Sequence, residues 1–202
     1  AETHRMLGFV ALTEATTAAQ LGESERAVRC ATTAVAEARG SKGFIAEALI
    51  SKALGLVQLG RAVEAEDCLE QARPVTSDSG EAHRSAVQAL VDVGLGRPEA
   101  AVAGATAVTG NPAATYLDHV YAGLAAAFGH AAMGATTSAS GALDRAAAIT
   151  LRTGDVLARA LISMARRDIG LAPSMDDDTT SGVEIEASLQ GWRRLFASYR
   201  GQ

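Results

Sequence analysis

The sequence predicts an all-α fold made of antiparallel helix hairpins, and three observations lead to this prediction. Of the 202 residues, 44 are alanine and only 4 are proline. Alanine has the lowest cost of helix formation, whereas a proline inside a helix costs about 3 kcal/mol. β-branched and aromatic residues do not gather in the alternating runs that are typical of strands. One pattern of helices and turns also occurs several times, which indicates a stacked repeat array.

The repeat is clearest at its turns. Gly22 recurs 38 residues later as Gly60 and 36 residues after that as Gly96, and each of these glycines follows a leucine. The alanines keep the same register, since Ala27 corresponds to Ala65 at the offset of 38. Equal offsets for turns and helix faces indicate that one structural unit is repeated.

The helices in the first half of the chain end at residues that interrupt helical structure. Gly22 can take the positive φ that is common just after a helix. Ser24 is suited to cap the next helix, and Pro74 ends the fourth helix because proline cannot continue it. The expected helices span residues 7–20, 24–38, 46–58, 62–73 and 81–93.

The second half has similar signals. Pro98 is expected just inside a helix, where its missing N–H does no harm, and Pro112 breaks the chain again. A degenerate fourth unit is expected to turn at Phe128-Gly129, and a further turn is expected at Gly154. The expected helices begin at residue 98 and then span residues 113–129, 135–151, 155–169 and 183–199.

Small residues on the second helix of each unit allow paired helices to approach closely. Ala27, Ala31 and Ala34 share one helical face. Such a face buries little area, and apolar burial contributes only about 25 cal/mol per Å². A single hairpin is therefore too weak to fold alone, and we expect the hairpins to stack.

This pattern resembles the tetratricopeptide repeat (TPR) over about residues 7–170. The first unit matches its signature at Ala15, Ala18, Gly22, Ala27, Ala31 and Ala34. The second unit matches at Leu49, Ala53, Leu56, Gly60, Ala65, Leu69 and Ala72. The third unit departs from the signature at Asp92, where a large residue belongs. The resemblance implies an α-α superhelix of TPR-like antiparallel helix hairpins with a C-terminal capping helix.

A narrower resemblance concerns residues 146–165 and 191–196, which look like the C-terminal repeat arrays of large actinobacterial transcriptional or signalling regulators. It implies a regulatory module excised from a larger protein. The expected organisation is an array over residues 1–170 with about four hairpins and one further helix, a flexible linker over 171–182, and a capping or docking helix over 183–202.

The TPR resemblance also implies a concave groove lined by the first helix of each unit. Its inward positions are expected to be Leu12, Thr16, Gln20, Glu47, Ile50, Leu54, Gln58, His83, Val87, Leu90, Tyr116 and His119. An apolar groove suits an amphipathic helix or an extended peptide. Trp192 and Phe196 have open alternatives: they cap the array, cover the groove, pack into a second copy of the chain or dock on other domains.

The sequence accordingly predicts a non-catalytic protein–protein interaction scaffold whose partner is a protein or peptide segment or a second copy of the chain. The alternative is a small-molecule effector-sensing domain of a transcriptional or nucleotide-signalling regulator. A formal net charge of −5 without a basic cluster argues against nucleic acid or a membrane as the partner. Two cysteines in a chain of this length favour a reducing, cytoplasmic location.

No catalytic constellation, cofactor site or metal site is predicted. The four histidines have no metal-ligand spacing with cysteine or carboxylate partners. Asp176-Asp177-Asp178 offers oxygen donors, but Ser181 stands where a calcium loop needs glycine. These residues are therefore interpreted as part of a solvated linker.

Overall fold

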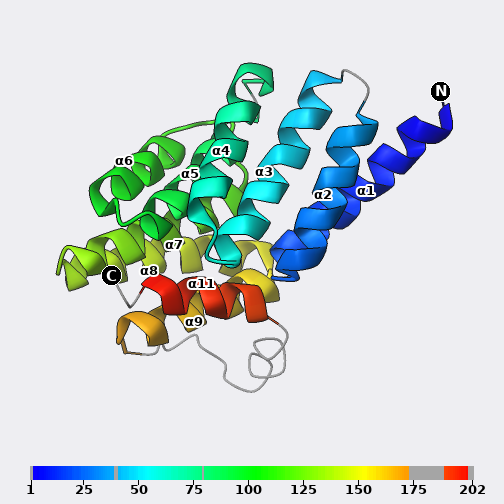
Figure 1. Ribbon diagram of the computed structural model, residues 1–202. Coiled ribbons are helices and arrows are strands. Elements are labelled where there is room, and N and C mark those ends of the chain that lie inside the picture. The colour runs from blue at the N-terminus through cyan, green and yellow to red at the C-terminus, as the bar shows by residue number, and fades with distance from the viewer. Residues whose placement is uncertain (1, 39–40, 79, 173–188, 200–202) are drawn as a thin grey trace.

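The computed structural model describes residues 2–38, 41–78, 80–172 and 189–199, and this part of the chain is all-α, as predicted (Figure 1). A 3-10 turn, η1 (Arg73–Val75), follows the fourth helix. The ten α-helices of the described residues are α1 (Glu2–Gln20), α2 (Ser24–Glu37), α3 (Lys42–Gln58), α4 (Ala62–Ala72), α5 (Glu81–Gly94), α6 (Pro98–Thr109), α7 (Tyr116–Ala132), α8 (Thr136–Thr153), α9 (Val156–Ile169) and α11 (Gln190–Tyr199).

Helices that follow one another in sequence pack side by side. The pairs α1 with α2, α3 with α4, α5 with α6 and α7 with α8 run in antiparallel fashion, and each pair also contacts the next pair (Figure 1). The core runs between these helices, and the seam that contains Ala27, Ala31 and Ala34 is buried. The prediction of a close, alanine-lined helix contact is confirmed.

The turns at Gly22, Gly60 and Gly96 are confirmed, with φ of 72°, 75° and 69°. The predicted turn at Phe128-Gly129 is wrong, because α7 continues to Ala132 and the positive φ belongs to Gly134. Gly129 is a glycine for a different reason. A Cβ on it would lie 2.9 Å from the carbonyl oxygen of Pro98, where α7 crosses the start of α6.

The helix ends show one further correction. Ser24 does not cap α2: it is the first helical residue, and its buried hydroxyl donates to Gln58 Oε1 at 3.0 Å. Pro98 is the first residue of α6, as predicted. Asp155 begins α9 as its cap, because its carboxylate accepts the N–H of Ala158 at 3.0 Å.

The predicted linker lies outside the described residues except for Leu171 and Ala172, and of the predicted last helix the structure describes residues 189–199. The division of the chain into array, linker and final helix therefore stays a prediction. Within the described ranges, no helix is both long and apolar enough to cross a membrane.

Candidate functional site

The candidate site is the surface on which α11 lies. The helix packs on α3, α5 and α9 and runs crosswise to α3 (Figure 1). It also contacts the end of α1 and the aromatic side chains of α7. We call this surface the α11 seat and define it by Gln20, Gly22, Leu90, Tyr121 and Phe128.

Trp192 anchors the first turn of α11. Its indole is fully buried, and its Nε1–H donates to the backbone oxygen of Gln20 at 2.8 Å. Next to it, the Gly191 N–H donates to the Gly22 oxygen at 3.0 Å. The Gln20 oxygen lies at the end of α1, where helical carbonyls have no partner within the helix, and Gly22 lies in the turn that follows. The last helix thus satisfies one carbonyl at the end of α1 and one in the turn between α1 and α2.

Aromatic rings continue the contact along α11. The ring centroids of Trp192 and Tyr121 are 5.5 Å apart, and Phe196 stacks on Phe128 at 5.0 Å. Tyr199 meets the edge of Phe128 at 4.9 Å. Offset and edge-on ring pairs of this kind add about 0.5–1.5 kcal/mol each beyond the area that they bury.

Tyr199 closes the far end of the seat. Its hydroxyl donates to the backbone oxygen of Leu90 at 2.7 Å. Burial raises the pKa of both Tyr199 and Tyr121, because a phenolate would lose its hydration there. Both hydroxyls are therefore neutral at physiological pH.

Gln58 of α3 forms hydrogen bonds to the end of α1 and to the start of α2, close to Gln20 and Gly22 of the α11 seat. Its Nε2 donates to the backbone oxygen of Ala19 at 2.8 Å, and its Oε1 accepts from Ser24. The side chain is fully buried. A buried amide with partners on both sides holds α1, α2 and α3 in one arrangement.

His83 and Asp118 form a polar pair beside Tyr121. His83 Nδ1–H donates to Asp118 Oδ1 at 2.7 Å, and Asp118 Oδ2 accepts the Thr115 N–H at 2.8 Å in a capping box at the start of α7. Burial acts to raise the pKa of Asp118, but the hydrogen bonds from His83 and Thr115 outweigh it, so this pKa lies below its usual value. The Asp118 carboxylate is therefore ionised and accepts hydrogen bonds from His83 and Thr115.

The predicted groove residues differ in burial: some are buried in the core and others are partly or fully exposed. Trp192 and Phe196 are fully buried where α11 packs on α3, α5 and α9. Leu12, Thr16, Gln20, Glu47 and His83 are partly buried, and Tyr116 is exposed and donates to Asp155. The positions that are fully or almost fully buried are Ile50, Leu54, Gln58, Val87 and Leu90.

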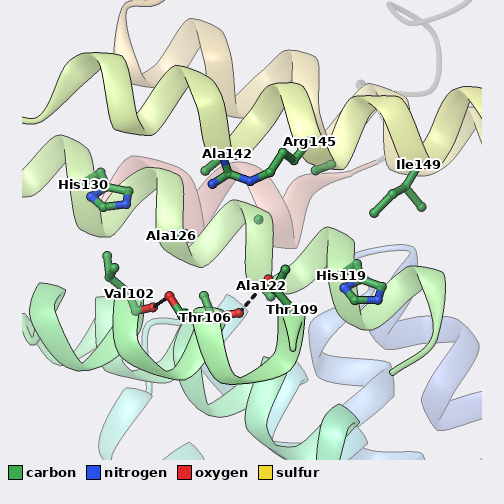
Figure 2. Close-up of a pocket in the computed structure, with 13 residues that line it drawn as sticks. Val102, Thr106, Thr109, His119, Ala122, Ala126, His130, Ala142, Arg145 and Ile149 are labelled. Carbon is green, nitrogen blue, oxygen red and sulfur yellow. Dashed lines mark hydrogen bonds between the residues drawn. The ribbon is translucent and has the colours of Figure 1, made fainter. Parts of the chain in front are cut away.

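His119 lies apart from the others, in a cleft that α6, α7 and α8 form (Figure 2). We call it the α6–α8 cleft; its volume is ≈ 80 Å³. Small residues of α7 such as Ala122 and Ala126 line it, together with His130 and with Arg145 of α8. None of its lining residues, all within the described ranges, is acidic.

Sequence reasoning missed Tyr121 and Phe128 as residues of the seat. The two are seven residues apart on α7 and so share a helical face. That spacing is the signal that could have identified them. The sequence analysis instead predicted Tyr116 and His119 as the residues of this helix that face the groove.

The described residues show no grouping of three or more His, Cys, Asp or Glu side chains that could hold a metal ion. Cys30 and Cys68 are both free thiols. The arrangement offers hydrogen-bond acceptors, aromatic rings and buried apolar area. These groups hold α11 in place.

Comparisons with known proteins add no family: no family model matches the chain, and neither the curated proteins nor the solved structures gave a match.

Proposed function

We propose that this chain is a non-catalytic protein–protein interaction module, an α-α superhelix of TPR-like hairpins whose inner surface binds a helical segment. The repeated positive-φ glycines at Gly22, Gly60, Gly96 and Gly134 support the repeat architecture. Their spacings are 38, 36 and 38 residues. The resemblance of residues 146–165 to regulator arrays favours a regulatory setting.

The observation that carries the proposal is the way in which α11 is held. Trp192, Phe196 and Tyr199 follow one another at four and three residues, the spacing of anchors on one face of a helix. All three are buried in the α11 seat. The chain's own last helix thus supplies an example of the ligand: an amphipathic helix with aromatic anchors.

A peptide-binding experiment tests this proposal. A labelled peptide of residues 189–199 is titrated into the wild-type chain and into a Trp192→Ala, Phe196→Ala double variant. In the wild type, the tethered α11 competes at an effective concentration of about millimolar. We therefore expect the peptide to bind the double variant at least about tenfold more tightly than the wild type.

The control peptide carries alanine in place of the tryptophan and should not bind. Circular dichroism verifies that the double variant remains helical. If the folded double variant binds neither peptide, the proposal that this surface receives helices is wrong.

The α6–α8 cleft favours a second candidate, the small-molecule effector domain. Arg145 can present N–H donors there without an acidic neighbour in the lining, an arrangement that suits a small carboxylate. A ligand present at about 100 times its dissociation constant would stabilise the native state by about 2.7 kcal/mol. A thermal-shift screen of small carboxylic acids tests this candidate, and Arg145→Gln should abolish any shift.

A further inference from the structure

The floor of the α6–α8 cleft is a face of α7 whose counterpart on α5 carries very different side chains. The positive-φ glycines that follow these two helices, Gly96 and Gly134, set an offset of 38 residues between them. The residues of α7 that line the cleft are His119, Ala122, Gly123, Ala126 and His130, and their counterparts on α5 are Glu81, Arg84, Ser85, Gln88 and Asp92.

On α5 these positions carry polar side chains that bond to one another. Arg84 donates to Glu81 from two nitrogens, at 2.8 and 2.5 Å, and Ser85 donates to the same carboxylate at 3.2 Å. One turn further on, Gln88 donates to Asp92 at 3.2 Å. A layer of paired polar groups therefore covers this face of α5, whereas alanine and glycine leave most of the same face of α7 bare.

The α6 wall of the cleft differs from the preceding hairpin in the same way. Its lining residues include Val102, Thr106 and Thr109, and their counterparts at an offset of 36 residues are Glu66, Glu70 and Arg73. Glu66 forms an ion pair with Arg97, and Glu70 forms one with Arg73. The charged side chains of that hairpin are thus replaced by short uncharged ones at the cleft.

Arg145 of α8 is the one Arg, Lys, Asp or Glu residue that lines the cleft, all of whose lining belongs to the described ranges. Its guanidinium lies beside Ala142 (Figure 2). Among the described residues no carboxylate pairs with Arg145, because the neighbouring Asp144 instead binds Arg166. A guanidinium offers two parallel N–H donors that match a carboxylate. Compared with the layer on α5, the cleft therefore lacks the acid.

The rest of the cleft sets the size and polarity of what it can hold. Seven of the thirteen lining residues are alanine, valine or isoleucine, so most contacts with a ligand are apolar. The volume is ≈ 80 Å³. An engineered apolar cavity of about 150 Å³ binds benzene, which has six carbon atoms, so the cleft has room for about three.

We propose that the α6–α8 cleft binds a free short-chain aliphatic carboxylate. Its carboxylate pairs with the Arg145 guanidinium, and an alkyl chain of about three carbon atoms lies over Ala122 and Ala126. The ligand thus supplies the acid that Glu81 provides on α5. This inference rests on the second candidate function, the effector domain, and is independent of helix binding at the α11 seat.

NMR titration of the wild-type chain with butanoate tests the proposal. We expect saturable shifts of backbone amides in the middle of α7 and α8. Butanamide has nearly the same shape without the charge, and it should bind at least about tenfold more weakly, because hydrogen bonds between two charged groups are the stronger ones. Octanoate should bind no more tightly than butanoate, because its chain exceeds the space in the cleft.

Three variants assign the binding to the cleft. Arg145→Gln should weaken butanoate binding at least about tenfold, since it removes the charged donor. Arg152→Gln, at an exposed arginine of α8 outside the lining, is the matched control and should leave the affinity unchanged. Ala126→Gln gives α7 the residue that α5 carries as Gln88, and it should abolish binding by filling the cleft. Circular dichroism verifies that each variant is folded.

The outcomes separate this inference from the candidate function on which it rests. Failure of butanoate to bind the wild type saturably overturns the inference, as do equal affinities of the Arg145→Gln and Arg152→Gln variants. Arg145-dependent binding of larger acids alone overturns the ligand class and leaves the effector domain standing. Tighter binding of N-acetylglutamate methylamide than of butanoate overturns the assignment to a free acid, because that probe carries the carboxylate on a peptide backbone.

Discussion

Gly191 shows at the scale of one residue how closely α11 is fitted to the rest of the chain. Its N–H donates to the oxygen of Gly22 at 3.0 Å, and a Cβ on Gly191 would collide with that same oxygen and with Ser24 Oγ. Gly43 is the opposite case, since a Cβ there would meet nothing within 4 Å. The two glycines therefore respond differently to the same substitution.

We expect Gly191→Ala to lower the free energy of unfolding by about 1–3 kcal/mol, because the added methyl group forces α11 away from Gly22 and Ser24 between α1 and α2. Urea unfolding followed by the fluorescence of Trp192, the only tryptophan, measures this change. Gly43→Ala should cause no loss, and equal effects at the two positions would contradict the contact at Gly191.

Asp118 gives a second prediction at this scale. Its folded-state pKa is lowered, so its contribution to stability is fully present above the unfolded pKa near 3.8 and is lost as the pH falls through the folded value. Asp118→Asn should cost about 1–3 kcal/mol at pH 7, because one amide oxygen cannot serve the His83 Nδ1–H together with the N–H and the hydroxyl of Thr115.

The difference between wild type and Asp118→Asn should shrink when the unfolding experiment is repeated below about pH 4. The exposed Asp78 provides the control substitution Asp78→Asn. A difference that stays constant from pH 7 into this acid range would show that the carboxylate charge is not responsible.

At the scale of elements, helix crossings decide where glycine is required within a helix. A Cβ on Gly129 would lie 2.9 Å from both the Pro98 oxygen and Val102 Cγ2 of α6. Gly141 of α8 has only the guanidinium end of Arg145 nearby, at 3.5 Å. The sequence pattern does not distinguish the two glycines. The packing shows that only Gly129 lies where a larger residue would clash with a neighbouring helix.

Gly129→Ala should therefore destabilise the protein by about 1–3 kcal/mol through overpacking at the α6–α7 crossing. Gly141→Ala should stabilise it by about 0.5–1 kcal/mol, because alanine is the better helix former. Thermal or urea unfolding of the two variants compares these effects. A stabilising Gly129→Ala would mean that α6 and α7 are not in close contact.

For the whole molecule, α11 is the element that connects distant parts of the chain. Trp192 reaches Gln20 across 172 positions, and Tyr199 reaches Leu90 across 109 positions. Helices α1 to α8 pack mainly on their neighbours in sequence. The last helix therefore adds long-range cohesion to a stack that otherwise has local contacts.

Trp192→Ala should cost about 3–5 kcal/mol, the range for truncation of a fully buried large aromatic side chain. Urea unfolding followed by circular dichroism measures the loss, and hydrogen exchange should show faster exchange at the C-terminal ends of α1 and α5. Met133→Ala, at a methionine that is 40% exposed, is the control and should have little effect. Unchanged exchange at α1 and α5 would contradict the connecting role of α11.

The sequence by itself determined the local structure of this protein. The all-α class, the turns at Gly22, Gly60 and Gly96 and the start of α6 at Pro98 could all be predicted, because each depends on residues close together in sequence. The periodicity also predicted that Ala31 shares a face with other small residues. Propensity, helix-end chemistry and periodicity are properties of short segments.

Only the tertiary structure decided which segment packs against Leu90 and its neighbours. The register could place Leu90 on an inner face, but it could not show that Tyr199 donates to its carbonyl group from 109 positions away. It also placed His119 with the groove, whereas the structure puts it in the α6–α8 cleft. The physical reason is that a helical pattern specifies which residues share a face, whereas the occupant of that face depends on how distant segments pack together.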